Sequence, residues 1–477
     1  MHHSRLVGGL AALAVLLVLL AAPVASALPL RVVWSDHCGA AADDGFTALA
    51  AGPAGAVYAA GFTMAPGAAN APGSGGQLLL VKYVDGDGAM SREWVRTFAV
   101  HGVNGASASK VAVDSFGNVI VAGTVGVPDL RGKGSDIVLL KYSSAGALLW
   151  KTTYDGPGHR EDYVNGLALD AHDNALMVGA SVGKGTARDY VTLKVRADGS
   201  RAWVRRYAGP GGFDEARGVA VDAAGNVYVT GWTNGRPKVK ATNGMRRSLT
   251  VSYTPAGTQR WLATVGRLHS WSGAAAVMLS DVRGARGVII AGYQGDWASG
   301  NENLMFVKYD PASGKVVWKR MLANGATTEP YAAAIDGSGA PAAAGMCNRS
   351  GLGIQGYIAG VSASGGDAWH SAFSSEFGNP GWAEFDALAV GAGGSVLAGG
   401  WAQSAEPPSE LSASTPTAFV VRYSPFWPVA APLDYVGAGS PTSNDKCAAV
   451  AIGVNGMYAV GQESSATEGL DAVLIKF

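Results

Sequence analysis

Short runs of apolar residues recur along the chain in groups of four, and turn residues separate the runs. The clearest group reads VAVD at 111–114, VIVAG ending at Gly123, DIVLLKY ending at Tyr142 and ALLWKTTY around Trp150. Runs of this length, rich in β-branched residues and bounded by Gly, Asn and Asp, indicate β-strands joined by tight turns. Each group therefore predicts a sheet of four antiparallel strands.

The same group recurs through the chain. The glycine that ends the second strand marks each copy, at intervals of about 57 residues: Gly61, Gly123, Gly179, Gly231, Gly292, Gly345, Gly400 and Gly461. In most copies the third strand ends in Lys-Tyr or a close variant, and the fourth carries a tryptophan. A four-stranded unit repeated in this way is typical of a β-propeller.

The two ends of the chain complement each other within this repeat. The last copy stops at Phe477, at the end of its third strand, and the missing tryptophan strand matches LRVVW at residues 30–34. We therefore predict an all-β, eight-bladed propeller closed by the N-terminal strand completing the last blade; seven blades is the alternative. The predicted blades begin near residues 42, 104, 161, 214, 270, 327, 382 and 443.

The first 27 residues have the pattern of a secretory signal. A basic residue, Arg5, precedes a long apolar run that ends in the small residues Ala25-Ser26-Ala27. We expect cleavage there, a single propeller domain at 28–477, and a secreted, periplasmic or cell-surface protein. The alternative is a retained membrane anchor, since the apolar run borders on spanning length.

The charge and composition of the chain argue against nucleic acid and membranes as partners. The chain has 36 Lys and Arg against 36 Asp and Glu, so it offers no general electrostatic attraction to nucleic acid or anionic membranes. No second apolar run predicts membrane insertion after the signal is removed. The 68 glycines suit a fold built from tight turns.

Two cysteines fall in the blade that joins the chain ends. Cys38 follows the borrowed fourth strand and Cys447 enters the first strand of the same blade. In an oxidising compartment they could form a disulfide that locks the ring. The alternative is a pair of buried thiols, because the first and fourth strands are not adjacent.

Propeller connectivity places the long, irregular loops on one face. Five tryptophans outside the repeat register share that face: Trp232, Trp271, Trp297, Trp382 and Trp401. Exposed indoles there predict a binding surface for a protein or a carbohydrate. The alternative is that they fill gaps between blades.

Basic residues cluster beside Trp232. They are Arg236, Lys238, Lys240, Arg246 and Arg247. This run predicts a contact with an anionic partner such as an acidic polysaccharide, and a solvated loop is the alternative.

Acidic residues recur eight positions before the end of the first strand. They are Asp44, Asp162, Asp214 and Asp445, with Glu329 and Glu384 one step off. A ring of such carboxylates at the channel mouth can bind Ca²⁺. We expect instead that each accepts hydrogen bonds from a neighbouring crossing and that the protein has no cofactor, with Ca²⁺ as the alternative.

The segments ARGVAVDAAGNVYVTGWT (216–233) and DIVLLKYSSAGALLWKTTY (136–154) resemble the bacterial SBBP β-propeller repeat family. The resemblance covers nearly the whole of 28–477. It implies a propeller fold in an exported or surface protein, and it implies no shared catalytic residues.

No catalytic motif such as GxSxG or HExxH stands out in the sequence. We therefore predict an exported, non-catalytic propeller that binds a protein or carbohydrate through its long-loop face. The alternative is a metal-assisted lyase or hydrolase at the channel mouth. The sequence does not indicate an oligomeric state.

Overall fold

The computed structural model describes most of the chain beyond the predicted signal. The described residues are 32–38, 43–64, 76–86, 89–100, 105–126, 134–209, 212–234, 246–266, 270–295, 301–323, 327–349, 353–373, 382–391, 394–403, 417–424, 427–433, 445–465 and 469–477. The predicted signal at 1–27 therefore lies outside them. Within these ranges there are thirty-two β-strands, one short 3-10 turn, η1 (Pro53–Gly55), and no helix that could cross a membrane.

The strands follow one another closely along the chain. Those of the first half are β1 (Trp34–Cys38), β2 (Asp44–Ala51), β3 (Ala56–Thr63), β4 (Gln77–Asp85), β5 (Met90–Phe98), β6 (Ala106–Val113), β7 (Val119–Val125), β8 (Asp136–Tyr142), β9 (Leu148–Tyr154), β10 (Asp162–Leu169), β11 (Ala175–Val182), β12 (Arg188–Val195), β13 (Arg201–Tyr207), β14 (Asp214–Val221), β15 (Val227–Asn234), β16 (Arg246–Tyr253) and β17 (Gln259–Val265). Those of the second half are β18 (Ser272–Ser280), β19 (Gly287–Gly295), β20 (Glu302–Tyr309), β21 (Val316–Leu322), β22 (Thr327–Ile335), β23 (Pro341–Arg349), β24 (Gly353–Val361), β25 (Ala368–Phe373), β26 (Trp382–Val390), β27 (Val396–Gln403), β28 (Thr417–Ser424), β29 (Trp427–Leu433), β30 (Lys446–Ile452), β31 (Met457–Ser465) and β32 (Gly469–Lys476).

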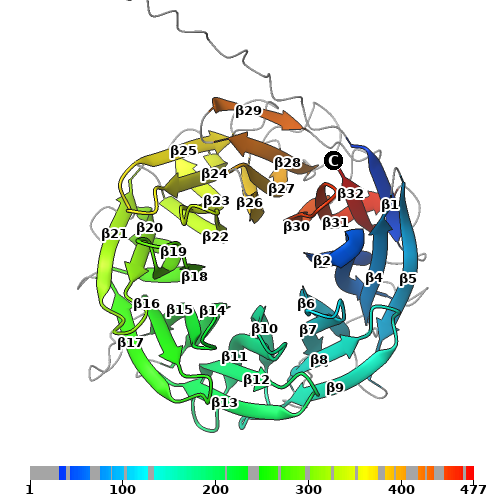
Figure 1. The fold of residues 1–477 in the computed structure, drawn as a ribbon, viewed down its shortest axis with the longest axis horizontal. Helices are drawn as coiled ribbons and strands as arrows, with labels where there is room; N and C mark the ends of the chain where they lie inside the picture. The colour runs from blue at the N-terminus through cyan, green and yellow to red at the C-terminus, as the bar shows by residue number, and fades with distance from the viewer. Residues whose placement is uncertain are drawn as a thin grey trace, which may run out of the picture.

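These strands form a ring of small antiparallel sheets around a central opening (Figure 1). Six sheets have four strands each. The strands β22–β25 and β26–β29 form a seventh sheet, in which the two groups meet through one parallel bridge between Ile354 and Trp382. The first strand of each group, from β2 to β30, lies nearest the opening, and the fourth strand lies at the outside. The predicted all-β fold of four-stranded antiparallel sheets is confirmed.

The N-terminal strand pairs with the C-terminal one. β1 lies antiparallel to β32, with Trp34 opposite Lys476. Trp94 stands opposite Lys82 in the same way within its own sheet, so Trp34 fills the expected position of the repeat. The described strand begins at Trp34 and continues to Cys38, whereas the sequence placed it at 30–34. The difference arises because a fourth strand in this fold extends beyond its tryptophan, as β5 does.

Four tryptophans of the repeat link their sheet to the next one by a hydrogen bond. The indole N–H groups of Trp94, Trp150, Trp203 and Trp261 donate to backbone carbonyls of the following sheet at 2.9–3.1 Å. Apolar side chains fill the space between neighbouring sheets, as Tyr58 and Leu140 do in one such cluster. The core is therefore a series of packed layers around the ring.

Cys38 and Cys447 are free thiols, so the predicted disulfide is wrong. The sheet order β1-β32-β31-β30 puts two strands between them. Three strand spacings amount to about 14 Å, about twice the Cα separation that a disulfide spans. The two side chains also enter different layers, because Cys38 packs with Tyr83 and Cys447 packs with Leu397.

Every innermost strand contains a β-bulge at the same position. One residue of each strand has no partner in the register with its neighbour: Thr47, Ser109, Asn165, Arg217, Ala275, Tyr331, Asp386 and Ala448. A bulge redirects a side chain relative to the regular alternation of a strand. The bulged residues therefore form a distinct set on the innermost strands.

Candidate functional site

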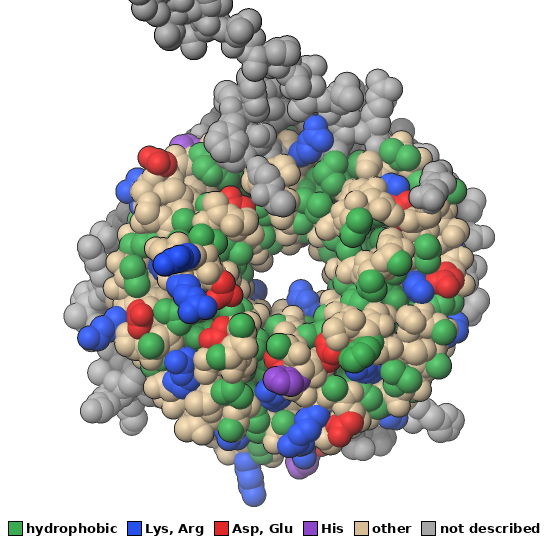
Figure 2. All heavy atoms as spheres, in the orientation of Figure 1, with side chains coloured by type: hydrophobic (Ala, Val, Ile, Leu, Met, Phe, Trp, Pro, Cys, Tyr) green, Lys and Arg blue, Asp and Glu red, His purple; other side chains and the backbone are tan. Residues whose placement is uncertain are grey.

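A cavity of about 520 Å³ lies against the innermost strands β10, β14, β18, β22 and β26. We call it the central pocket. Five bulged residues line it, one from each strand: Asn165, Arg217, Ala275, Tyr331 and Asp386. Figure 2 shows the opening of the ring with acidic and basic side chains around its margin. The pocket thus receives side chains that the bulges of five successive strands present.

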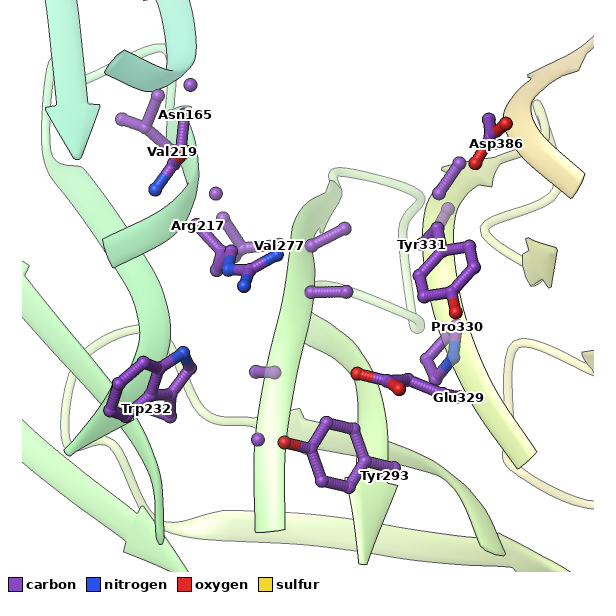
Figure 3. Close-up of a pocket in the computed structure, with 18 of the residues that line it drawn as sticks. Asn165, Arg217, Val219, Trp232, Val277, Tyr293, Glu329, Pro330, Tyr331 and Asp386 are labelled. Carbon is purple, nitrogen blue, oxygen red and sulfur yellow. The ribbon is translucent and has the colours of Figure 1, made fainter. Parts of the chain in front are cut away.

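Trp232 closes one side of the central pocket (Figure 3). Its side chain comes from β15 and is only 9% exposed. The guanidinium of Arg246 lies 4.3 Å from the centre of the indole ring, which is within range of a favourable cation–π contact. The indole nitrogen is buried and has no hydrogen-bond partner among the described residues. It lies on the side of the ring that faces Arg217 and the open space.

Arg217 and Asn165 are held by Glu215. The Nε atom of Arg217 is 2.7 Å from one carboxylate oxygen of Glu215, and Asn165 donates to the same oxygen at 3.1 Å. Tyr163 donates to the other oxygen at 2.9 Å. Asn165 also donates to the carbonyl of Ala216 at 2.8 Å. These contacts position one cationic and one amide side chain on the same wall of the pocket.

Acidic groups occupy the opposite wall. Burial raises the pKa of Glu329, and the charges of Arg217 and Arg246 act against that rise. Burial, with the nearby charge of Glu384, raises the pKa of Asp386 to about 6. The Tyr331 hydroxyl points towards Glu329 in Figure 3, and burial raises its pKa as well. The pocket therefore presents both hydrogen-bond donors and acceptors near neutral pH.

The other predicted tryptophans have different surroundings. Trp271 donates its indole N–H to the carboxylate of Glu302, whose pKa is raised by burial. Trp401 lies under the ammonium group of Lys446, 5.3 Å from the ring centre. Trp382 is 53% exposed. Trp297 lies outside the described residues.

Of the predicted basic run, only two members are described. Arg246 lies in the pocket, and Arg247 donates to the carbonyl of Gly266 at 2.6 Å. Arg236, Lys238 and Lys240 lie outside the described residues. Of the residues predicted to bind a ligand, Trp232 and Arg246 therefore lie together in the central pocket.

The four predicted acidic positions lie in four different sheets and are almost completely buried. They are Asp44, Asp162, Asp214 and Asp445. Asp214 accepts a hydrogen bond from Thr233 and another from the backbone of Asn234 at 3.2 Å. Asp44 accepts from the backbone of Met64 at 3.3 Å. Within the described residues, Asp162 belongs to a group of three carboxylates with Asp136 and Asp155.

Sequence reasoning missed most of the pocket. Three lining residues lie within inner strands, a few positions after the strand begins: Arg217, Tyr331 and Asp386. Read as a regular strand, with side chains alternating between its two faces, the sequence carries no sign that these residues differ from their neighbours. The signal was a polar or aromatic residue recurring three or four positions after the start of the first strand. A bulge at that position is what directs these side chains together.

A ring of four-stranded antiparallel sheets with a central pocket defines a β-propeller. The model of the SBBP β-propeller repeat family matches residues 202–237, which include β14 and β15. The chain therefore carries the SBBP-type propeller repeat that its sequence predicted. No curated protein matches this chain in sequence.

Several solved structures resemble the fold. A protein of unknown function from Bacteroides caccae is 14% identical, with a TM-score of 0.32 over 64% of this chain and 96% of that one. The polysaccharide lyase Uly1 is 9% identical, with a TM-score of 0.41 over 83% and 91%. An exo-β-1,3-galactanase from Phanerochaete chrysosporium is 11% identical, with a TM-score of 0.32 over 93% and 100%. These values are too low to indicate a shared function.

Proposed function

We propose that this protein is an exported eight-bladed β-propeller that binds a carbohydrate in its central pocket without transforming it. The indole N–H of Trp232 carries the proposal. A buried donor that faces a cavity and has no partner among the described residues needs an acceptor from a ligand or from water. A sugar hydroxyl supplies that acceptor.

The remaining lining suits a ligand rich in hydroxyl groups. Arg217 offers donors on one wall, and Glu329 and Asp386 offer acceptors on the other. Hydroxyl groups both donate and accept, so a carbohydrate can use both walls. The volume of about 520 Å³ lies within the usual range of small-molecule sites.

The blade number rests on two observations. Eight glycines mark eight copies of the repeat, and the N-terminal strand pairs with the last strand of the chain. Export rests on the signal-like segment at 1–27. If the protein is exported as proposed, its carbohydrate ligand lies outside the cytoplasm.

A polysaccharide lyase or hydrolase is the second candidate. The pKa of Asp386, raised to about 6, favours it, because a carboxyl group with such a pKa can act as a general acid near neutral pH. Burial raises the pKa of Glu329 in the same direction. We place binding first, since these groups also serve as hydrogen-bonding partners of a ligand.

Isothermal titration against a panel of neutral and acidic oligosaccharides tests the proposal. Trp232→Phe keeps an aromatic ring beneath Arg246 and removes the N–H group together with the rest of the five-membered ring of the indole. We expect about five- to tenfold weaker binding, the value of one hydrogen bond. Trp382→Phe, at a half-exposed site outside the pocket, should bind like the parent. Equal affinity of Trp232→Phe and the parent would contradict the proposal.

Turnover separates the two candidates. Incubation with the bound oligosaccharide should leave it intact. Release of products, lost in Glu329→Gln or Asp386→Asn but kept in Trp382→Phe, would establish the enzyme instead.

A further inference from the structure

Three aspartates meet where the sheet of β6–β9 adjoins the sheet of β10–β13. Asp136 begins β8, Asp155 follows β9, and Asp162 begins β10. One carboxylate oxygen of each lies within 4.8 Å of the others. Three negative charges at this distance repel strongly unless a cation lies among them.

Asp162 is the buried member of the group and has an unsatisfied oxygen. Its side chain is fully buried, and Oδ2 accepts from the backbone N–H of Gly156 at 2.6 Å. Oδ1 has no partner in hydrogen-bonding geometry among the described residues, and the hydroxyl of the neighbouring Ser181 acts against the rise that burial causes in the pKa of this carboxyl. Asp214, at the same position of the next sheet, has both oxygens occupied. Burying a charged carboxylate oxygen without a donor costs free energy, and a bound cation would offset that cost.

The next junction along the ring contains the missing positive charge. There Asp189 and Asp214 stand in place of Asp136 and Asp162, and Arg206 lies 2.8 Å from Asp189. Arg206 pairs with Val191 in one sheet, and Thr153 pairs with Val138 in the other. Arg206 and Thr153 therefore occupy equivalent positions. The first junction thus has threonine where the second has arginine.

The third carboxylate, that of Asp155, is also present at the first junction and absent from the second. Asp155 directly follows the tyrosine that ends β9, and Ala208 follows the tyrosine that ends β13. One junction therefore has two carboxylates and a guanidinium that pairs with one of them. The other has three carboxylates, and of the described groups beside them the guanidinium of Arg206 reaches only neutral ones, in Tyr154 and Ser181. The only basic partner described for Asp155 is the exposed imidazole of His159, at 2.6 Å.

We propose that Asp136, Asp155 and Asp162 bind a hard divalent cation, Ca²⁺, at this junction. All three ligands are oxygens, which Ca²⁺ prefers, and water completes its shell. Two oxygens bound to one ion at about 2.4 Å lie at most about 4.8 Å apart, whereas the Mg²⁺ distance of about 2.1 Å limits them to about 4.2 Å. The three carboxylate oxygens lie within 4.8 Å of one another, a separation that Ca²⁺ can span.

Calcium titration of the chelator-treated full chain tests this site by calorimetry and by the midpoint of thermal unfolding. We expect saturable binding of one ion and a midpoint that rises with Ca²⁺ concentration. Thr153→Arg introduces the guanidinium of the next junction, and Asp155→Ala introduces its alanine. Each should weaken binding at least tenfold.

Asp281→Asn is the matched control, because Asp281 is an exposed carboxylate that faces only Arg286 at 3.8 Å among the described residues. It should bind Ca²⁺ like the parent. Circular dichroism checks that each variant is folded. We expect Asp155→Ala to fold, because Ala208 occupies the equivalent position at the next junction. Absence of saturable binding in the parent, or parental affinity in both Thr153→Arg and Asp155→Ala, would overturn the site. Mg²⁺ binding as tight as Ca²⁺ binding would overturn the choice of ion.

Discussion

The guanidinium of Arg246 covers the face of Trp232, with 4.3 Å between the guanidinium carbon and the ring centre. This relationship changes how the indole can serve a ligand. A sugar ring cannot stack on the face that Arg246 already covers. The ammonium group of Lys446 lies over Trp401 in a similar way.

Removing the guanidinium should cost stability. A cation–π contact at a partly exposed site contributes about 0.5–1 kcal/mol. We expect Arg246→Ala to lower the free energy of unfolding by about that amount, measured by urea titration. Arg286→Ala, at an exposed arginine with a single long ion pair, should have no measurable effect. Equal stability of the two variants would show that the stacked contact contributes nothing.

The central pocket can be filled without touching its polar groups. Ala275 is the bulged residue of β18 and lines the pocket. Ala275→Trp should abolish binding of any pocket ligand while leaving the circular dichroism spectrum unchanged. Ala448→Trp places the same side chain on the bulge of β30, which is not part of the pocket lining. Binding should survive in that control, and its loss in both variants would argue against the pocket.

Stability should depend on pH through Asp386. Burial raises the pKa of this carboxyl to about 6, above its unfolded value near 4. Its contribution to stability is therefore fully present below pH 4 and is lost as pH rises through 6. We expect Asp386→Asn to be about 1–2 kcal/mol more stable than the parent at pH 8.

At pH 4 the same substitution should make little difference, because the parent carboxyl is then protonated. Urea unfolding at both pH values gives the comparison. Asp281→Asn, at an exposed site, serves as the control. A gain in stability for Asp386→Asn that is equal at pH 4 and pH 8 would contradict the assigned pKa.

The pairing of β1 with β32 should matter for folding more than for binding. Trp34 packs edge-on against Tyr83 of the adjoining sheet, with ring centres 5.8 Å apart. We expect Trp34→Ala to lose about 2–3 kcal/mol of stability, somewhat less than a fully buried aromatic residue. Trp34→Phe should lose less. Oligosaccharide affinity at 20 °C should be unchanged in both, and a stable Trp34→Ala variant would contradict the role of this strand.

Cys38 and Cys447 should be unreactive thiols in the native protein. Burial raises the pKa of Cys447 to about 12 and also raises that of Cys38, so neither forms the thiolate that reacts with alkylating reagents. Peptide mapping after alkylation should find both residues unmodified in the native state. In denaturant, without a reductant, both should be labelled. Failure to label them until a reductant is added would show that they are oxidised.

Local pattern was sufficient for the repeat and its register. The alternation within each strand, the glycine that ends the second strand and the tryptophan of the fourth are properties of neighbouring residues. For this reason the placement of Trp34 opposite Lys476 could be predicted from opposite ends of the chain. The disulfide prediction failed because the residue pattern did not show that Cys38 and Cys447 enter different layers.

The sequence by itself determined the four-stranded repeat and the residues that pack between sheets, since both follow from strand periodicity. Only the tertiary structure decided which side chains meet. A bulge in each inner strand brings Arg217, Tyr331 and Asp386 to one pocket. The junction of two sheets brings Asp136 to Asp155 and Asp162. Such encounters depend on how sheets curve and adjoin around the ring, and periodicity within a strand carries no information about that.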